Sequence, residues 1–278
     1  MPLSPSRSHA ARIAQDTVDI VAAGRYSNPA GRTVHIRHLV DAARDGTVSY
    51  PPDANLPKIV TSDRETRFEV VPETTLAAAW RLVGEGHRVV ALNFASARHP
   101  GGGFLNGARA QEESLCRASG LYRCINGNPM YAHHAPMPGG MYTNYAIYCP
   151  EVPVIKDDDG TLLDEPYLCS FITSPAVNAG AIRDRERGLV AGEMERRVDK
   201  VLAIAAGHGH DAAVLGAWGC GVFKNDPGMV ADLFRSALVT RFAGVFPRVV
   251  FAVYDSSADA HVFGAFRDRF GAASELPG

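Results

Sequence analysis

The sequence predicts an α/β fold, in which a mixed central sheet lies between two layers of helices and follows a partly helical N-terminal extension. Two observations predict this class. Short apolar segments alternate with amphipathic segments of about 12–17 residues, as strands alternate with helices in such sandwiches. Two glycine-rich stretches each follow an apolar segment and precede a helical one. Because ligands of these folds bind beyond the carboxyl ends of the strands, both stretches should lie at one edge of the sheet.

The first quarter of the chain, residues 1–67, is predicted to be an extension packed on the main body. Residues 8–23 carry an approximate amphipathic stripe behind a serine that can cap a helix. The stretch 25–67 is irregular and offers one possible edge strand, at 33–36. The main body is then expected to span residues 68–278.

Strands and helices alternate regularly from residue 68 onward. Strands are expected at 68–71, 87–94, 145–149, 152–155, 167–173, 212–215 and 248–254. Helices are expected at 73–84, from the first glycine-rich loop to about 119, and at 192–207, 227–243 and 258–270. The segment 121–144 is too irregular for an assignment, and 157–160 is a hairpin-type turn.

Composition excludes several classes of function. With 46% hydrophobic and 21% charged residues, the chain is typical of a soluble globular protein. Its formal net charge of -2 gives no basic field, so we expect neither direct DNA binding nor attraction to an anionic membrane. The first residues lack a long apolar segment, and no stretch approaches about 18 uninterrupted apolar residues. These features predict a cytoplasmic protein.

No metal and no cofactor are expected. The five cysteines are odd in number, are spread along the chain and form no C-x-x-C pair. The pairs His133-His134 and His208-Gly209-His210 have no carboxylate or cysteine at a known ligand spacing, so packing or surface roles are favoured.

The first glycine-rich stretch contains three consecutive glycines, Gly101, Gly102 and Gly103. A triplet alone is weak evidence, because a flexible turn needs the same residues. Between a strand and a helix, however, unshielded backbone N–H groups can point at a phosphate or a ribose hydroxyl.

Two adjacent carboxylates, Glu112 and Glu113, follow in the first turn of the next helix. Acids at this position often serve only to complement the helix dipole. Successive helical residues diverge by about 100°, so the two acids should not face one point. This divergence suits a division of labour, in which one carboxylate grips a hydroxyl and the other meets a scissile bond.

The second glycine-rich stretch presents Gly219, Cys220, Gly221, Val222 and Phe223 before a helix. Its amides and the helix N-terminus form a plausible cradle for a diphosphate. It is not a dinucleotide-binding fingerprint, because a lysine stands where the third glycine is needed.

Three glycines, a short gap and then Gln111-Glu112-Glu113, followed by the second loop, resemble the poly(ADP-ribose) glycohydrolase family. The similarity is to its shorter, bacterial-type branch and extends over about residues 68–270. The resemblance implies a macrodomain-like three-layer α/β/α core. It also implies a hydrolase that cleaves ribose–ribose O-glycosidic bonds of poly(ADP-ribose), acts from the chain terminus and releases ADP-ribose. Poly(ADP-ribose) or ADP-ribosylated proteins would be its partners, in the setting of ADP-ribosylation and the DNA damage response.

The resemblance also implies roles for individual residues. Glu113 would be the catalytic acid, and Glu112 would orient the ribose beside the scissile bond. Gly101, Gly102 and Gly103 would line the distal ribose and phosphate, and Gln111 belongs to the same ligand-binding signature. The diphosphate loop would comprise Gly219, Cys220, Gly221, Val222 and Phe223.

At the other end of the ligand, Tyr254 would stack on adenine and Glu73 would meet the adenine edge. The final helix, with Arg267, and the N-terminal extension are candidates to cover the adenosine. Two positions depart from the larger animal-type enzymes, which place asparagines where Ser96 and Ala217 align. Asn93 is a candidate to supply such a polar contact.

The chemistry is intelligible from the residues. A glycosidic bond cleaves through an oxocarbenium-like state and needs its leaving oxygen protonated by an acid with a raised pKa. Two alternatives remain: a macrodomain that binds ADP-ribose without cleaving polymer, and a mono-ADP-ribosyl hydrolase. The glutamate pair favours an enzyme, because a pure reader does not need it.

Overall fold

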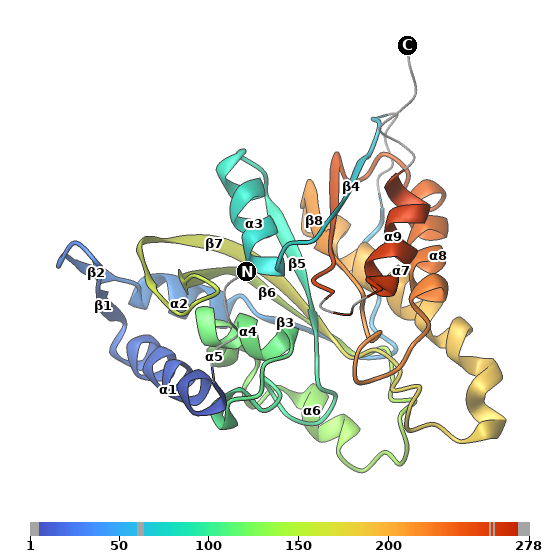
Figure 1. The fold of residues 1–278 in the computed structure, drawn as a ribbon, viewed down its shortest axis with the longest axis horizontal. Coiled ribbons are helices and arrows are strands. Elements are labelled where there is room, and N and C mark those ends of the chain that lie inside the picture. Colours follow the sequence, from blue (N-terminus) through green and yellow to red (C-terminus); the bar gives the residue numbers. More distant parts are fainter. Residues whose placement is uncertain (1–5, 60–63, 256, 258, 272–278) are drawn as a thin grey trace.

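The computed structural model describes residues 6–59, 64–255, 257 and 259–271, and its centre is a seven-stranded sheet (Figure 1). In spatial order its strands are β3 (Val48–Tyr50), β6 (Ala146–Lys156), β7 (Leu162–Ser174), β5 (Val89–Phe94), β8 (Ala212–Leu215), β9 (Arg248–Ala252) and β4 (Arg67–Val71). The pairs from β7 to β4 are parallel, whereas β3 with β6 and β6 with β7 are antiparallel. The sheet is therefore mixed, as predicted.

Helices cover both faces of this sheet. One face carries α3 (Thr75–Gly84), α4 (Gln111–Ala118) and α5 (Leu121–Ile125), and the other carries α7 (Val190–Gly207), α8 (Pro227–Val239) and α9 (His261–Phe270). The remaining elements are α1 (Arg7–Ala23), β1 (Arg25–Ser27), β2 (Thr33–His35), α2 (Arg37–Asp45), η1 (Phe104–Asn106), α6 (Pro129–His134) and η2 (Asp184–Leu189). The predicted three-layer sandwich is thus confirmed.

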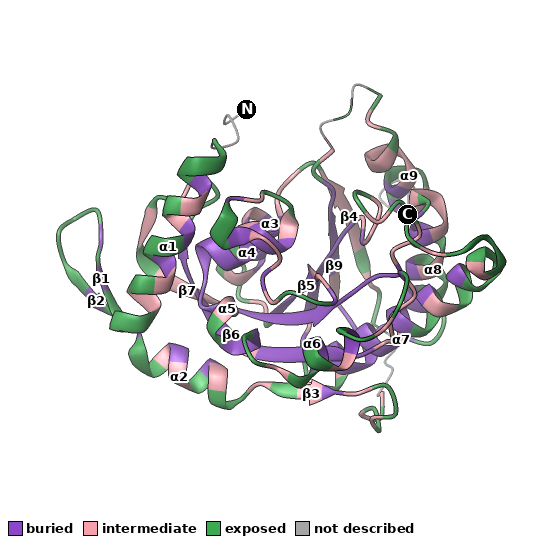
Figure 2. Ribbon diagram, turned by 90° about the horizontal axis from the view of Figure 1, so that it is seen from below, coloured by how far each residue is buried: buried purple, intermediate pink, exposed green. Residues whose placement is uncertain are grey.

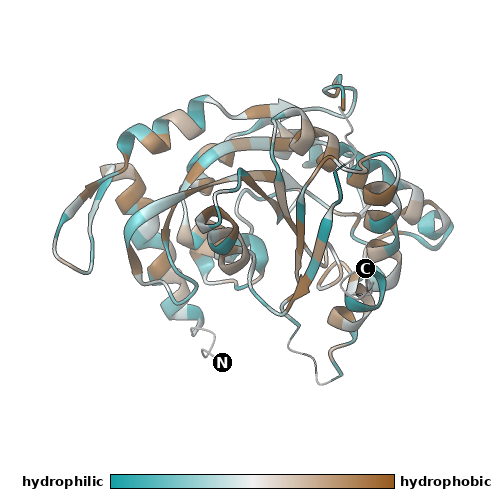
Figure 3. Cartoon of the chain, turned by 90° about the horizontal axis from the view of Figure 1, so that it is seen from above, coloured by the Kyte–Doolittle hydropathy of each residue, from teal (hydrophilic) through white to brown (hydrophobic). Residues whose placement is uncertain are grey.

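The apolar strands are explained by two cores, one on each face. Along β5, Val89 and Ala91 belong to one core, and Val90 and Leu92 belong to the other. Successive strand residues point to opposite faces, so a strand covered on both sides must be apolar throughout. Figure 2 shows β5 as buried, and Figure 3 shows hydrophobic residues on the central strands and on the helices around them.

The N-terminal part has more regular structure than expected. The edge strand predicted at 33–36 is confirmed as β2, which pairs with β1. The prediction that the rest of 25–67 is irregular is wrong, since α2 and β3 form there and β3 joins the central sheet. Ile36 stands at the N-cap of α2 and makes no side-chain cap, so the usual signal for a helix start is missing. The division between residues 67 and 68 stays a prediction.

Other boundaries also differ from expectation. The two strands predicted at 145–155 are one strand, β6, with a register shift between Cys149 and Val152. The unassigned segment 121–144 contains α5 and α6, and the helix predicted to reach 243 ends at Val239. The expected start of the final helix, Ala258, lies outside the described residues, and α9 begins at His261. In the described chain, no helix is long and apolar enough to cross a bilayer.

Candidate active site

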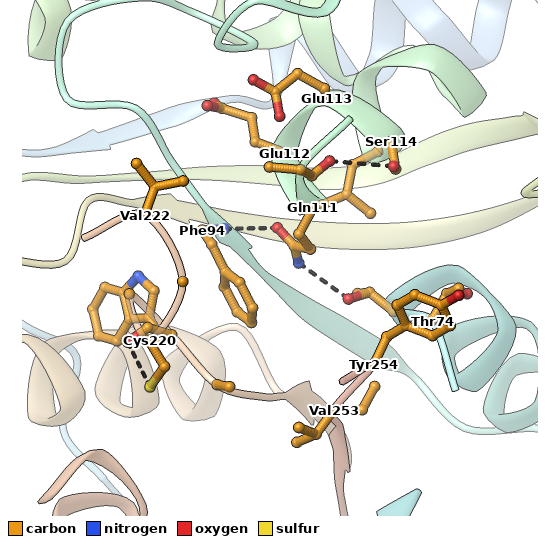
Figure 4. A pocket seen from close by; sticks show the side chains of 18 of the residues that line it. Thr74, Phe94, Gln111, Glu112, Glu113, Ser114, Cys220, Val222, Val253 and Tyr254 are labelled. Atoms are coloured by element: carbon orange, nitrogen blue, oxygen red, sulfur yellow. Dashed lines mark hydrogen bonds between the residues drawn. The ribbon is translucent and has the colours of Figure 1, made fainter. Parts of the chain in front are cut away.

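A cavity of about 590 Å³ lies beyond the carboxyl ends of the parallel strands. Residues that follow β4, β5, β7, β8 and β9 all contribute to its wall, together with the first turns of α3 and α4. The second glycine-rich loop forms one side (Figure 4). The topology therefore brings polar segments from distant parts of the sequence to one edge of the sheet, as expected for this fold.

Glu112 and Glu113, in the first turn of α4, both line the cavity and are both buried. Their carboxylates meet at Gly102, where an added Cβ would overlap Glu113 Oε1 and lie 3.2 Å from Glu112 Oε2. The expectation that the two acids cannot face one point is therefore wrong. The Cα–Cβ bonds of adjacent helical residues diverge, but a glutamate has three rotatable side-chain bonds that bring the carboxylates together. Gly102 has φ +58°, which also favours glycine.

Backbone amides hold the two carboxylates in different ways. Glu112 Oε2 accepts from Ser96 N at 2.7 Å, and Glu112 Oε1 lies 3.4 Å from Asn93 Nδ2. Glu113 Oε1 accepts from Gly103 N at 3.0 Å. Glu113 Oε2 is buried and has no hydrogen-bond partner among the described residues. The carboxylate of Glu112 is thus held at both oxygens, whereas the carboxylate of Glu113 is held only at Oε1.

Burial raises the pKa of Glu112 to about 8, and the neighbouring charge of Glu113 acts in the same direction. The hydrogen bonds from Ser96, Asn93 and Gly101 oppose this effect without cancelling it. Burial therefore favours the protonated form of Glu112 at neutral pH. The raised pKa falls on Glu112, which is 3% exposed.

The triple glycine and Asn93 lie behind the carboxylates. Among the described residues, neither Asn93 nor Gly101, Gly102 or Gly103 lines the cavity. Asn93 is fully buried, and its Nδ2 donates to Thr173 Oγ1 at 3.0 Å as well as facing Glu112. In this structure these residues support the acids, and their predicted contact with a ligand stays a prediction.

Gln111 lines the cavity but uses its amide within the protein. Its Oε1 accepts from Phe94 N at 2.9 Å, and its Nε2 donates to Thr75 Oγ1 at 3.1 Å and to the Leu92 carbonyl at 2.8 Å. Figure 4 shows the bonds to Phe94 and Thr75. Gln111 thereby fastens α4 to β5 and α3, which fixes where the acids stand.

The second loop lines the cavity with all five predicted residues: Gly219, Cys220, Gly221, Val222 and Phe223. The amides of Gly219, Gly221, Val222 and Phe223 donate to no acceptor among the described residues. Unpaired amides in a loop are suited to bind an anion. At the start of α8, Asp226 accepts from Met229 N at 2.7 Å, and the expected role of this helix N-terminus stays a prediction.

The other end of the cavity combines aromatic, acidic and apolar residues. Tyr254 and Glu73 both line it, as predicted, and Figure 4 shows Tyr254 near Thr74 and away from the two glutamates. Of the two candidate covers, α9 contributes Val262, whereas no described residue of the N-terminal extension lines the cavity. Arg267 pairs with the neighbouring Asp268 instead.

Sequence reasoning missed several lining residues, notably Phe94, Thr74, Asp158 and Asp255. The turn at 157–160, which contains Asp158, predicts only a hairpin. Nothing in its sequence indicates that the tip of the hairpin reaches α3. Thr74 could have been found, since its hydroxyl caps α3 by accepting from Ala77 N. Ser96 and Ala217, the two departures from the larger enzymes, also line the cavity.

Fold and site together define a glycosidase built on a macrodomain-like α/β/α sandwich, with a pair of buried carboxyls and a loop of unpaired amides on one cavity. Residues 14–157 match the family described as "Microbial-type PARG, catalytic domain", and the chain belongs to this family of poly(ADP-ribose) glycohydrolases. A search of curated proteins found no match.

Solved structures of bacterial enzymes agree with this assignment. The chain is 48% identical to poly(ADP-ribose) glycohydrolase from Thermomonospora curvata, with a TM-score of 0.89 over 94% of this chain and 99% of that chain. The same enzyme bound to the inhibitor ADP-HPD gives a TM-score of 0.87 at 48% identity, with the same coverage. The enzyme from Deinococcus radiodurans, in complex with ADP-ribose, gives 0.79 at 39% identity over 87% of this chain and 100% of that chain.

Proposed function

We propose that this protein hydrolyses the ribose–ribose O-glycosidic bonds of poly(ADP-ribose) and releases ADP-ribose. One observation carries the proposal: two adjacent buried carboxyls, of which Glu112 has a pKa raised by burial, line the same cavity as a loop of unpaired amides. The family assignment supports it. So do the bacterial enzymes of similar structure, which bind ADP-ribose or ADP-HPD.

Glu113 is the proposed catalytic acid. Glu113 lines the cavity, and its buried Oε2 has no hydrogen-bond partner among the described residues, so this oxygen is the one proposed to turn toward a leaving oxygen. In the first step it protonates that oxygen as the bond to the anomeric carbon breaks, and it then takes a proton from the attacking water. Glu112 is held by Ser96 and Asn93, and its fixed carboxyl would orient the ribose hydroxyls.

The rest of the ligand would follow the shape of the cavity. The unpaired amides of Gly221, Val222 and Phe223 would bind the diphosphate, and adenine would lie against Tyr254 beside Glu73. The residues 101–103 would approach the distal ribose. We propose action from the chain terminus, as the family resemblance implies, with Tyr254, Asp255 and Val262 lining the adenosine end of the cavity.

The proposed partners are poly(ADP-ribose) and ADP-ribosylated proteins in the cytoplasm, with a role in the DNA damage response that the family resemblance suggests. The net charge of -2 supports recognition of the polymer through the site itself, without binding to DNA.

The test is release of ADP-ribose from defined poly(ADP-ribose) by the wild type, Glu113→Gln and the exposed control Glu195→Gln. We expect Glu113→Gln to lose about 10²–10⁴ in rate, because it cannot donate a proton, and to retain ADP-ribose binding measured by calorimetry. The control should match the wild type.

Three outcomes would contradict the proposal. Tight ADP-ribose binding without release by the wild type would indicate a reader. Release from mono-ADP-ribosylated protein alone would indicate the mono-ADP-ribosyl hydrolase. Full activity of Glu113→Gln would leave the enzyme standing and remove Glu113 as its acid.

A further inference from the structure

Helix α1 of the N-terminal extension touches three separate parts of the active site from outside. No described residue of this helix lines the cavity. Its contacts are instead with the loop that holds Glu113, with the helix that carries Glu113, and with the hairpin between β6 and β7.

The first contact is at the N-terminus of α1. Arg7 Nε donates to the Asn106 carbonyl at 2.9 Å. Gly107, with φ +76°, packs so closely on Arg7 that an added Cβ would overlap the Arg7 carbonyl oxygen. The loop between Gly103 and Gly107 is thereby pressed against α1. Since Gly103 N binds Glu113 Oε1, a shift of this loop moves the catalytic carboxylate.

The second contact is in the middle of α1. Thr17, which is buried, donates to the Arg117 carbonyl at the end of α4. Arg117 in turn donates to the Ala108 carbonyl at 2.5 Å and to Ser114 Oγ at 2.9 Å. Loop and helix are therefore tied to each other and to α1.

The third contact fixes the hairpin. Lys156 is 1% exposed, and its ammonium donates to Asp16 Oδ2 at 2.6 Å, to Thr17 Oγ1 at 2.8 Å and to the Ile13 carbonyl at 3.2 Å. Gly160 packs on Ile13, whose Cδ1 would lie 2.6 Å from an added Cβ. A buried ammonium is costly without partners, so these bonds strongly favour one position of the hairpin.

The tip of this hairpin belongs to the cavity. Asp158 lines it and accepts from Thr74 Oγ1 at 2.6 Å, which joins the tip to the start of α3. The hairpin thus spans from α1 to the end of the cavity that contains Tyr254 and Glu73. The catalytic loop, by contrast, meets α1 at the end that contains the acids.

We propose that α1 is a positioning element of the active site, in which Arg7 sets the catalytic loop and the Asp16–Lys156 pair sets the Asp158 hairpin. The inference rests on the proposed function, which places catalysis at the end of the cavity with the acids and adenine binding at the end with Tyr254 and Glu73. It assigns to the N-terminal extension a role in positioning the site from outside, since none of its described residues lines the cavity.

The two contacts should differ in their kinetic effects. Arg7→Ala is expected to lower kcat about tenfold and to leave KM within about twofold, because a displaced acid affects the chemical step. Asp16→Ala is expected to raise KM about fivefold and to leave kcat nearly unchanged, because the hairpin bounds the binding end. Arg7→Lys and Asp16→Glu, which keep a donor and a carboxylate, should restore most of the wild-type values.

Matched controls lie on the same helix. Arg12→Ala and Asp19→Ala remove an arginine and an aspartate whose side-chain hydrogen bonds stay within α1, to His9 and Gln15. Both should resemble the wild type in kcat, KM and Tm. Asp16→Asn is the second variant if Asp16→Ala does not fold.

The outcomes are distinct. If the wild type is active and Arg7→Ala and Asp16→Ala match their controls, the positioning role is wrong. It is also wrong if kcat and KM change together in both variants in step with a lower Tm. If the wild type releases no ADP-ribose, the proposed function fails. The hairpin contact is then judged by ADP-ribose affinity alone, which Asp16→Ala must weaken relative to Asp19→Ala.

Discussion

At the scale of single residues, Glu112 illustrates two opposing effects on one carboxyl. The amide of Ser96 and the side chain of Asn93 favour the charged form, whereas removal from water favours the neutral form. Burial is the larger effect, and the pKa rises to about 8. As pH rises, the folded protein must release this proton and thereby accept a buried charge on Glu112 beside Glu113, which destabilises the folded state.

This shift predicts a pH-dependent stability. The native pKa of about 8 exceeds the ordinary value of 4.5, so between these values the folded state binds a proton that the unfolded state has released. The contribution is fully present below about pH 4.5 and is lost as pH rises through 8. Glu112→Gln removes the titration, so its Tm relative to the wild type should be higher at about pH 8.5 than at about pH 5. An equal difference at both values, in thermal unfolding followed by circular dichroism, would contradict it.

Residue identities in the site could be predicted from sequence, but their contacts could not. Glu112, Glu113 and the loop at Gly219 were recognised from spacing and all line the cavity. Gly102 lies against both carboxylates because the first glycine-rich loop folds back toward them. The spacing of these residues along the sequence does not predict that contact. Asp158 was missed for the same reason, since a hairpin turn reveals nothing of what its tip meets.

At the scale of elements, the loop after β8 depends on one glycine. Gly219 has φ +76°, and an added Cβ would lie 2.5 Å from Asn225 Nδ2 and 2.6 Å from Ala176 Cβ. Asn225 Nδ2 donates to the carbonyls of Val177 and Gly219, which holds the loop to the segment after β7. The position of the unpaired amides therefore depends on this contact.

Gly219→Ala should weaken ADP-ribose binding at least tenfold, because left-handed backbone costs a non-glycine residue about 1–2 kcal/mol and the clash displaces the loop. Gly192→Ala, where an added Cβ meets nothing within 4 Å in α7, is the control and should bind normally. Calorimetric titration with ADP-ribose measures both. Unchanged affinity in Gly219→Ala would show that the loop does not hold the ligand.

Strands with a clear apolar pattern could be predicted from the sequence, whereas short elements without a pattern or a cap could not. The strands β5, β8 and β9 are apolar because helices cover both faces, and that pattern is visible in the sequence. In contrast, β3 has three residues, and its pairing with β6 is a contact between distant parts of the chain. The helix α2 has no capping side chain. Because tertiary contacts stabilise both β3 and α2, the local sequence does not predict them.

At the scale of the whole molecule, the N-terminal part completes the sheet. Val48, Ser49 and Tyr50 pair with Tyr148, Ile147 and Ala146, so β3 covers an edge of β6. A chain that begins at Pro51 should expose unpaired groups of β6, and exposed edges favour association between copies. We expect this variant to form larger species than the full chain in size-exclusion chromatography with light scattering. A monodisperse monomer with wild-type Tm would contradict the expectation.

The pairing of β3 with β6 also has a consequence for biosynthesis. Translation delivers α1 and β3 first, yet their partners, Lys156 and the strand from Ala146, follow only after much more of the chain has been made. Until then α1 can pack only on β1, β2 and α2, and β3 has no strand with which to pair. The contacts of α1 and β3 with the sheet are therefore expected to form late, and the acids acquire their final geometry only when the hairpin after β6 has left the ribosome.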